Sequence, residues 1–220
     1  MAIETVKTIV VLSMHRTGSS LVANLLHNAL HVTMGQRFLG KGPWNRQGVW
    51  EDIAFVSLNK SILRACGTDY QTGWKHPPDR DRVLALGERE RWQERIRELV
   101  QSRRDLWGWK DPRTCLTIPL YHPYLENPHY VCTVRRHEDI IKSLEKRGIK
   151  KHGQQFWQGL IQRYESDRTR FLHEVDAPCL TVCFERFVSK KLWKDEVEML
   201  AKFVEVETDM KKARNIIQWK

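Results

Sequence analysis

Four short apolar runs, separated by longer stretches with helical spacing, are the feature that most limits how this chain can fold. Residues 8–13, 106–109, 130–134 and 179–184 are rich in the β-branched and aromatic side chains typical of buried strands. Helix-compatible sequence follows each run. Strands that alternate with helices need crossover connections, which produce a mostly parallel sheet covered on both faces. We therefore expect an α/β fold with about four to five strands in its central sheet.

The stretches between the apolar runs predict helices, because their apolar residues recur three or four positions apart. The expected helices cover residues 21–30, 53–65, 89–101, 138–147, 155–175 and 192–204. Residues 31–35 are compatible with a further short strand, and residues 210–220 are expected to be a frayed tail. A chain of 220 residues corresponds to a single domain, which we place over residues 1–220.

Charge and cysteine content limit the class of protein. The chain has 37 Lys and Arg against 27 Asp and Glu, a formal net charge of +10 that favours a polyanionic partner. Nucleic acid, an anionic membrane surface, a sulfated polymer and a multiply charged nucleotide all fit this charge. The five cysteines form no C-x-x-C pair, so neither a disulfide framework nor a zinc site is indicated. No apolar run has the length of a membrane span or signal peptide, and we expect a cytoplasmic protein.

The first strand leads through residues 13–20 directly into a helix, the position of a phosphate-binding loop. Compared with the nucleotide-binding pattern G-x-x-x-x-G-K-[ST], this loop lacks the first glycine and has Ser19 in place of the lysine. Arg16 offers a replacement cation that can bind an anionic group in a bidentate manner. A purely structural interpretation is also open, in which Thr17 or Ser19 caps the helix and the arginine is incidental.

Four segments in order resemble those of sulfotransferases that use 3′-phosphoadenosine 5′-phosphosulfate (PAPS), particularly the bacterial type. Residues 15–20 (H-R-T-G-S-S) are similar to its G-M-H-R-S-G-T-S loop, and residues 45–51 (N-R-Q-G-V-W-E) to its N-P-K-G-Y-W-E segment. Residues 107–114 contain its W-G-x-K-D-P-R motif. Residues 134–143 resemble the 3′-phosphate motif, in which a serine follows a strand-end arginine by eight positions.

This resemblance implies a three-layer, P-loop NTPase-like fold and an enzyme that moves a sulfuryl group from PAPS to a hydroxyl or amine. The transfer would be in line, without a metal, and would release 3′-phosphoadenosine 5′-phosphate (PAP). The residues that the resemblance assigns to donor binding are His15, Arg16, Thr17, Gly18, Ser19 and Ser20 for the 5′-phosphosulfate, with Arg135 and Ser143 for the 3′-phosphate.

The resemblance also implies the catalytic groups. Arg16 and Lys110 would offset the charge that grows on the leaving phosphate, and Glu51 would accept the proton of the acceptor. Lys110 and Glu51 also have plainer interpretations. Lys110 could be a surface lysine, and Glu51 could be a carboxylate that stabilises the start of the helix near residue 53. Asp52 could also fill that position. His15 and His137 are reserve candidates for the base.

The chain departs from the better-studied relatives at residues 183–187, where C-F-E-R-F replaces Y-E-D-L and leaves Phe184 to stack on the adenine. It also lacks their C-terminal glycine-rich loop. Two other functions stay open: a noncatalytic basic module that binds nucleic acid or a polyanion, and a divergent P-loop kinase. The basic residues are dispersed along the chain instead of clustered in one stripe, which argues against nucleic-acid binding. A small-molecule or carbohydrate acceptor would lie against the loops at 37–50 and 67–80, and the oligomeric state is open.

Overall fold

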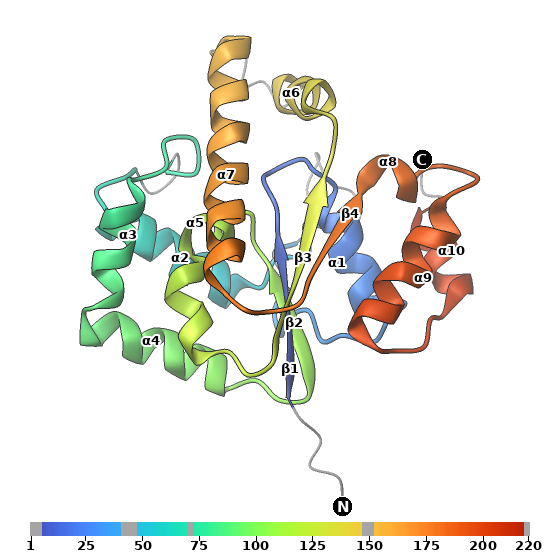
Figure 1. The fold of residues 1–220 in the computed structure, drawn as a ribbon, viewed down its shortest axis with the longest axis horizontal. Coiled ribbons are helices and arrows are strands. Elements are labelled where there is room, and N and C mark those ends of the chain that lie inside the picture. Colours follow the sequence, from blue (N-terminus) through green and yellow to red (C-terminus); the bar gives the residue numbers. More distant parts are fainter. Residues whose placement is uncertain (1–5, 41–47, 70–72, 147–151, 218–220) are drawn as a thin grey trace, which may run out of the picture.

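A parallel sheet lies at the centre of the molecule in this computed structural model, which describes residues 6–40, 48–69, 73–146 and 152–217. Within these ranges the sheet has the order β2-β1-β3-β4, and every neighbouring pair is parallel (Figure 1). The strands are β1 (Lys7–Leu12), β2 (Leu106–Lys110), β3 (Pro128–Val134) and β4 (Cys179–Cys183). They coincide with the four apolar runs, so the predicted α/β fold is confirmed.

Helices cover both faces of the sheet. They are α1 (Ser19–Asn28), α2 (Ile53–Ala65), α3 (Arg80–Gly87), α4 (Glu90–Gln101), α5 (Thr114–Tyr121), α6 (His137–Glu145), α7 (Gln154–Glu174), α8 (Phe184–Phe187), α9 (Trp193–Val204) and α10 (Met210–Ile217), with a 3₁₀ turn η1 at His122–Tyr124. Helices α2 to α5 and α7 lie on one side of the sheet, and α1, α9 and α10 on the other (Figure 1).

The alternation of side chains along β1 divides the core into two parts. Val10 and Leu12 face the cluster under α2 to α5 and α7, whereas Ile9 and Val11 face the cluster under α1, α9 and α10. All four side chains are fully buried, as expected for a central strand of a sheet covered on both faces. Because the strands are parallel, their carboxyl ends meet at one edge of the sheet, where ligands bind in such folds.

Helices α3 and α5 are among those that were not predicted from the sequence. Helix α5 contains Pro119 and is buried around almost its whole circumference, so it shows neither an apolar stripe nor a proline-free run. Helix α3 is short and has only Val83 and Leu86 buried. In both cases the packing against neighbouring helices, which is invisible in local periodicity, stabilises the element.

Two local predictions were wrong. Residues 31–35 form only an isolated parallel bridge between Thr33 and Trp107, although Val32 and Met34 are buried. The expected tail is helix α10 as far as Ile217, and Ala213 and Ile217 pack into the core beside α1. Among the described helices, none is both long and apolar enough to cross a bilayer.

Candidate active site

The loop at residues 13–20 is held by its own fold and by β3. Thr17 is buried, and its hydroxyl lies 2.9 Å from the carbonyl oxygen of Met14 and 2.6 Å from the hydroxyl of Thr133. Arg16 and Gly18 have left-handed backbone conformations, with φ of 71° and 94°. A Cβ atom at Gly18 would lie 2.2 Å from the ring of Phe184, so glycine is required there by conformation and by space.

The amino end of α1 carries no capping side chain among the described residues. Gly18 is its N-cap, and no acidic residue lies in its first turn. The suggestion that Thr17 or Ser19 caps this helix is therefore wrong, because the Thr17 hydroxyl is bound to the loop and to β3 instead. A helix end without a cap or a carboxylate retains the partial positive charge that favours an anion.

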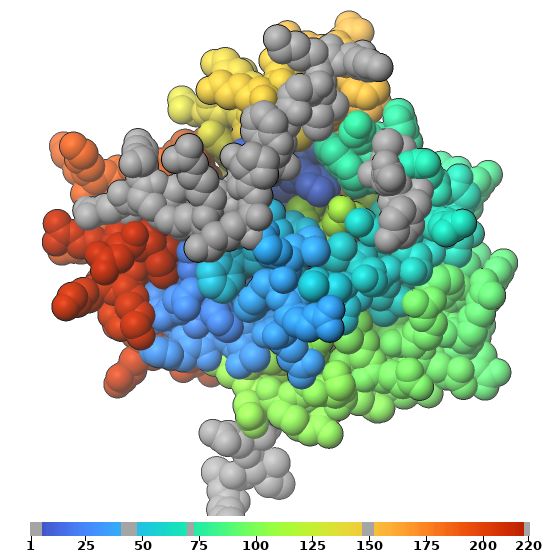
Figure 2. All heavy atoms as spheres, turned by 180° about the vertical axis from the view of Figure 1, so that it is seen from behind, coloured from blue at the N-terminus to red at the C-terminus, as the bar shows by residue number. Residues whose placement is uncertain are grey.

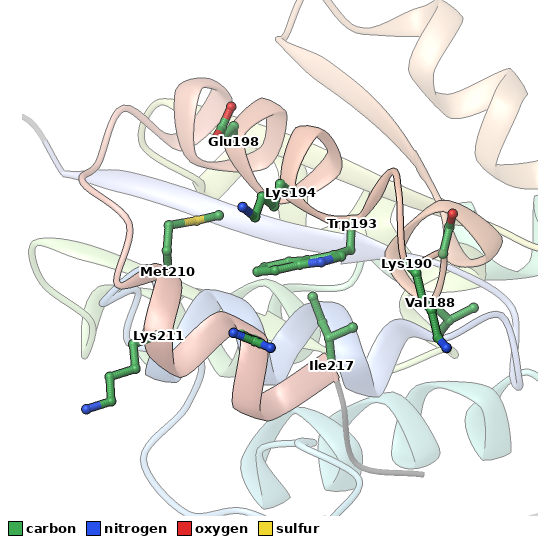
Figure 3. Close-up of a pocket in the computed structure, with 10 residues that line it drawn as sticks. Val188, Lys190, Trp193, Lys194, Glu198, Met210, Lys211 and Ile217 are labelled. Atoms are coloured by element: carbon green, nitrogen blue, oxygen red, sulfur yellow. The ribbon is translucent and has the colours of Figure 1, made fainter.

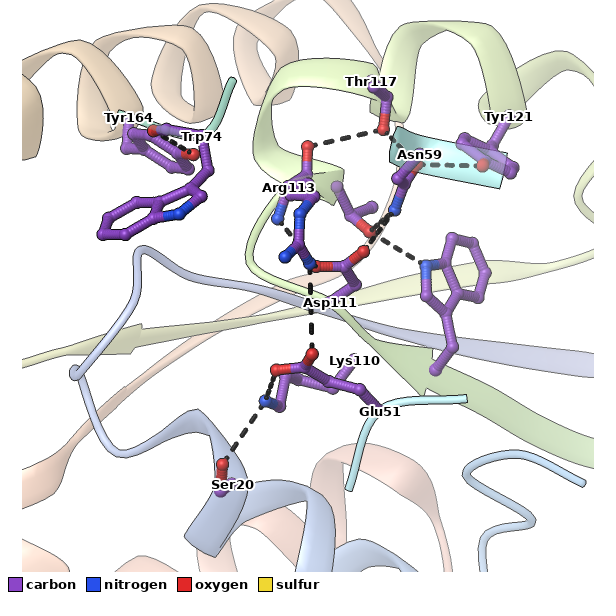
Figure 4. Close-up of polar contacts among 12 residues, drawn as sticks. Ser20, Glu51, Asn59, Trp74, Lys110, Asp111, Arg113, Thr117, Tyr121 and Tyr164 are labelled. Atoms are coloured by element: carbon purple, nitrogen blue, oxygen red, sulfur yellow. Dashed lines mark hydrogen bonds and ion pairs between the residues drawn. The ribbon is translucent and has the colours of Figure 1, made fainter. Parts of the chain in front are cut away.

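Lys110 connects the end of β2 to this helix end. Its ammonium nitrogen lies 2.8 Å from Oε1 of Glu51 and 3.3 Å from Oγ of Ser20 (Figure 4). Lys110 is only 2% exposed, which rules out the alternative of a surface lysine. Three residues that are far apart in the sequence therefore bring a cation, a carboxylate and a hydroxyl together beside the loop.

A buried polar network lies beneath this group and was missed in the sequence. Asp111 accepts hydrogen bonds from the backbone N–H of Arg113 at 3.1 Å, from its guanidinium at 2.7 Å, and from the amide of Asn59 at 2.9 Å. The guanidinium of Arg113 is also 4.0 Å from Oε2 of Glu51. Burial opposes the charge of Arg113, but Asp111 and Glu51 together raise its pKa.

Asn59 is the centre of this network. Its carbonyl oxygen accepts hydrogen bonds from Thr117 at 2.7 Å and Tyr121 at 2.9 Å (Figure 4). Together with the bond from its amide nitrogen to Asp111, these bonds connect α2 to α5 and to the end of β2. Asn59 is fully buried. An asparagine on the apolar stripe of a predicted helix is the signal that could have identified it, because buried amides need partners.

Asp52 and Glu51 are adjacent in the chain but face different partners. Asp52 caps α2 by accepting a hydrogen bond from the N–H of Ala54 at 2.9 Å, and it also accepts from the N–H of Gln36 at 2.8 Å. Its carboxylate forms a buried ion pair with Arg103 at 3.1 Å. Asp52 rather than Glu51 therefore stabilises this helix end, which leaves Glu51 free to pair with Lys110.

The three residues Arg16, Arg135 and Ser143 converge at the carboxyl end of β3. Arg16 Nε donates to Ser143 Oγ at 2.8 Å, and Arg135 Nη1 donates to the carbonyl oxygen of Arg16 at 3.1 Å. The guanidinium carbon of Arg135 lies 4.5 Å from the centre of the Phe184 ring. Burial, with a smaller contribution from Arg136, lowers the pKa of Arg135. Arg16 thus contacts the group predicted to hold the 3′-phosphate.

This cluster has unused capacity to bind an anion. Nε of Arg135 is buried without a hydrogen-bond partner among the described residues. A guanidinium in this situation gains from a phosphate or sulfate that supplies an acceptor. The residues present therefore fit a multiply charged nucleotide.

The reserve bases occupy separate positions. The imidazole of His15 lies 4.3 Å from the ring of Trp74 and 6.3 Å from that of Tyr164. His137 is paired with Glu165 at 3.1 Å on the neighbouring α7. Neither contact places the histidine beside Lys110. Residues 41–47 and Tyr70, which include part of the predicted acceptor loops and Trp44, lie outside the described residues.

The loop is partly exposed, because His15, Arg16, Gly18 and Ser20 are half-buried whereas Thr17 and Ser19 are buried. Figure 2 shows dark blue atoms from the first described residues at the floor of a hollow, beside yellow-green atoms and bordered by teal ones. Across the described part of the chain, no group of three or more His, Cys, Asp or Glu side chains is arranged to hold a metal ion.

A separate pocket of about 990 Å³ lies between α9, α10 and residues 188–190 (Figure 3). None of the predicted site residues lines it. Its side chains combine an apolar floor with a largely basic rim, and they are Val188, Ser189, Lys190, Trp193, Lys194, Glu198, Met210, Lys211, Arg214 and Ile217.

Comparison with the solved structure of sulfotransferase STF1 supports the architecture. The structure of sulfotransferase STF1 from Mycobacterium tuberculosis H37Rv is similar, with a TM-score of 0.56, 12% sequence identity, and coverage of 98% of this chain and 71% of that chain. The structure of deoxyadenosine kinase from M. mycoides with bound dATP gives a TM-score of 0.46 at 10% identity, and the match covers 90% of this chain and 99% of that chain. No protein-family model matches the sequence, and no curated protein matches it.

The likeness to STF1 shows that the two chains share an α/β fold. At 12% identity the likeness does not extend to the activity.

Proposed function

We propose that this protein is a PAPS-dependent sulfotransferase that transfers a sulfuryl group to a hydroxyl or amine and releases PAP. The observation that carries the proposal is the convergence of Lys110 Nζ on Glu51 at 2.8 Å and on Ser20 at 3.3 Å, beside the uncapped end of α1. The likeness to STF1 supports it at the level of the fold.

The chemistry needs three contributions from the protein. By analogy with loose phosphoryl transfer, the donor must be aligned, the charge on the leaving phosphate must be offset, and the acceptor must lose a proton. The amino end of α1 and Lys110 supply positive electrostatic potential at the same place. Glu51 supplies a carboxylate 2.8 Å from the Lys110 ammonium, and this carboxylate would take the proton of an acceptor bound beside it.

The cluster of Arg16, Arg135 and Ser143 supports a nucleotide with a second charged group, because it lies at the carboxyl end of the adjacent strand β3. Phe184 offers an aromatic face beside Arg135 for the adenine. We further propose a cytoplasmic location and a small-molecule or carbohydrate acceptor, with Trp74 near the loop as one flat surface for it.

Calorimetry separates this function from the alternatives. PAP should bind without magnesium, whereas ATP with magnesium should bind at least tenfold more weakly. Preference for ATP with magnesium would indicate a kinase, and binding of neither nucleotide would indicate a noncatalytic basic module. Acceptors that contain hydroxyl or amine groups can then be screened with labelled PAPS.

Lys110→Ala tests the observation itself. Loss of a charge that acts on the leaving group should reduce turnover by about a hundredfold or more. Lys142→Ala, which removes an exposed lysine from α6, is the matched control and should retain the parent rate. Equal rates for Lys110→Ala and the parent would remove the basis of the proposal.

A further inference from the structure

Two cysteines from neighbouring strands face each other on the sheet. Cys132 lies on β3 and pairs in register with Thr181 of β4, and Cys179 is the first residue of β4, two positions earlier. Side chains two positions apart on a strand point to the same face, so Cys179 lies on the same face as Cys132. Their sulfur atoms are 3.7 Å apart.

The surroundings of the two thiols differ. Cys179 is exposed on a strand at the edge of the sheet, whereas Cys132 is 1% exposed. The hydrogen bond from Cys132, together with the positive charge of Arg168, lowers the pKa of Cys179 to about 7, although burial opposes the shift. The same hydrogen bond and burial raise the pKa of Cys132.

We infer that Cys132 and Cys179 form a thiol modification site, in which a hydroperoxide oxidises the exposed Cys179 and the buried Cys132 then closes an intramolecular disulfide. The sulfurs are in contact and need to approach by about 1.7 Å to reach the disulfide bond length. Because Cys132 and Cys179 are diagonal neighbours on adjacent strands, closing the bond also requires a local shift of the edge strand β4.

The two steps balance. The thiolate of Cys179 attacks the peroxide, forms an S–O bond and breaks the O–O bond, so that hydrogen peroxide gives a sulfenic acid and hydroxide. The thiol of Cys132 attacks the sulfenic sulfur, loses its proton and expels the oxygen as water. Two electrons pass from the two sulfurs to the peroxide, and a dithiol reductant reverses the reaction.

The other cysteines are poor competitors. Burial raises the pKa values of Cys66 and Cys115, the latter to about 12. Cys183 lies on β4 as well, but burial and the carboxylate of Glu185, 3.1 Å away, raise its pKa. Because the thiolate is the reactive form, oxidation should select Cys179 from the five.

Mass spectrometry of the full chain tests the inference. The reduced protein is treated with hydrogen peroxide, its remaining thiols are alkylated, and the proteolytic peptides are identified. We expect a linked pair of peptides that contain Cys132 and Cys179, lighter by two hydrogen atoms than the separate peptides. Before oxidation, iodoacetamide at neutral pH should modify Cys179 about ten times faster than Cys66 or Cys183.

Variants distinguish a site from random oxidation. Cys179→Ser, a small change at an exposed position, should abolish the linked pair and leave Cys132 reduced. Cys183→Ser, the control on the same strand, should form the pair as the parent does. Absence of the linked pair in the parent, or oxidation of Cys132 in Cys179→Ser to the same extent as in the parent, would overturn the inference. None of these measurements depends on the proposed sulfuryl transfer.

Discussion

The amino ends of α1 and α2 face the same region of the molecule but are built in opposite ways. The end of α2 is complete, because Asp52 caps it and is itself paired with Arg103. The end of α1 has Gly18 at its N-cap and no side-chain cap among the described residues, and Lys110 donates a hydrogen bond to the hydroxyl of Ser20 in its first turn. A helix end that the fold has satisfied stabilises the structure, whereas one left open can bind an anion.

Glu51 and Asp52 are adjacent in the chain, but the carboxylate of Asp52 belongs to the amino end of α2, whereas that of Glu51 lies near the amino end of α1. Asp52 interacts with backbone N–H groups and a buried arginine, so its role is in folding. Glu51 interacts with Lys110, so its role is in the site. Substitutions at these two positions should therefore affect different measurements.

The largest effect is expected for Glu51→Gln. This change keeps the shape of the side chain but removes the proton acceptor, so turnover should fall about a hundredfold to ten-thousandfold. Steady-state rates with labelled PAPS measure the loss, and calorimetry with PAP should show nearly unchanged donor binding. A normal rate would reject Glu51 as the base and direct attention to His15 or His137.

Asp52→Ala should give the largest loss of stability. It removes the cap of α2 and leaves Arg103 buried without its carboxylate, which should cost about 3 kcal/mol. Urea unfolding measures the difference, and the rate per folded molecule should stay near that of the parent. Asp52→Asn, which can still cap the helix, should lose less stability. A large loss of turnover in a fully folded Asp52→Ala protein would contradict the division of roles.

Arg135→Ala should weaken PAP binding by about tenfold to a hundredfold, because a charged hydrogen-bond partner of the 3′-phosphate is lost. Ser143→Ala should weaken it about fivefold. Adenosine 5′-phosphate lacks the 3′ group, so calorimetry should show little change in its affinity for either variant. Equal losses for both nucleotides would show that Arg135 acts by supporting the loop through its bond to Arg16.

The smallest effect is expected for Thr17→Val. Its hydroxyl ties the loop to Met14 and Thr133, so its loss should cost about 1 kcal/mol of stability. Thr17→Ser keeps the hydroxyl and serves as the control in the same urea titration. Unchanged stability in Thr17→Val would mean that the loop does not depend on this anchor.

The sequence alone determined the order of the strands along the chain and the location of the first loop. Apolar runs and helical spacing are local properties, so β1 to β4 and helices α2, α4, α7 and α9 could be located by reading a few residues at a time. The order of four short motifs also indicated Glu51, Lys110, Arg135 and Ser143 as candidates, although no local property specified their partners.

Only the tertiary structure decided which carboxylate serves the site and which serves the fold. Glu51 and Asp52 are both acidic and precede the same helix, and their different partners, Lys110 and Arg103, lie more than fifty residues away. The buried Asn59 and the helices α5 and α10 were missed for the same reason. Their stability comes from contacts between distant segments, and such contacts leave no periodic signal in the sequence.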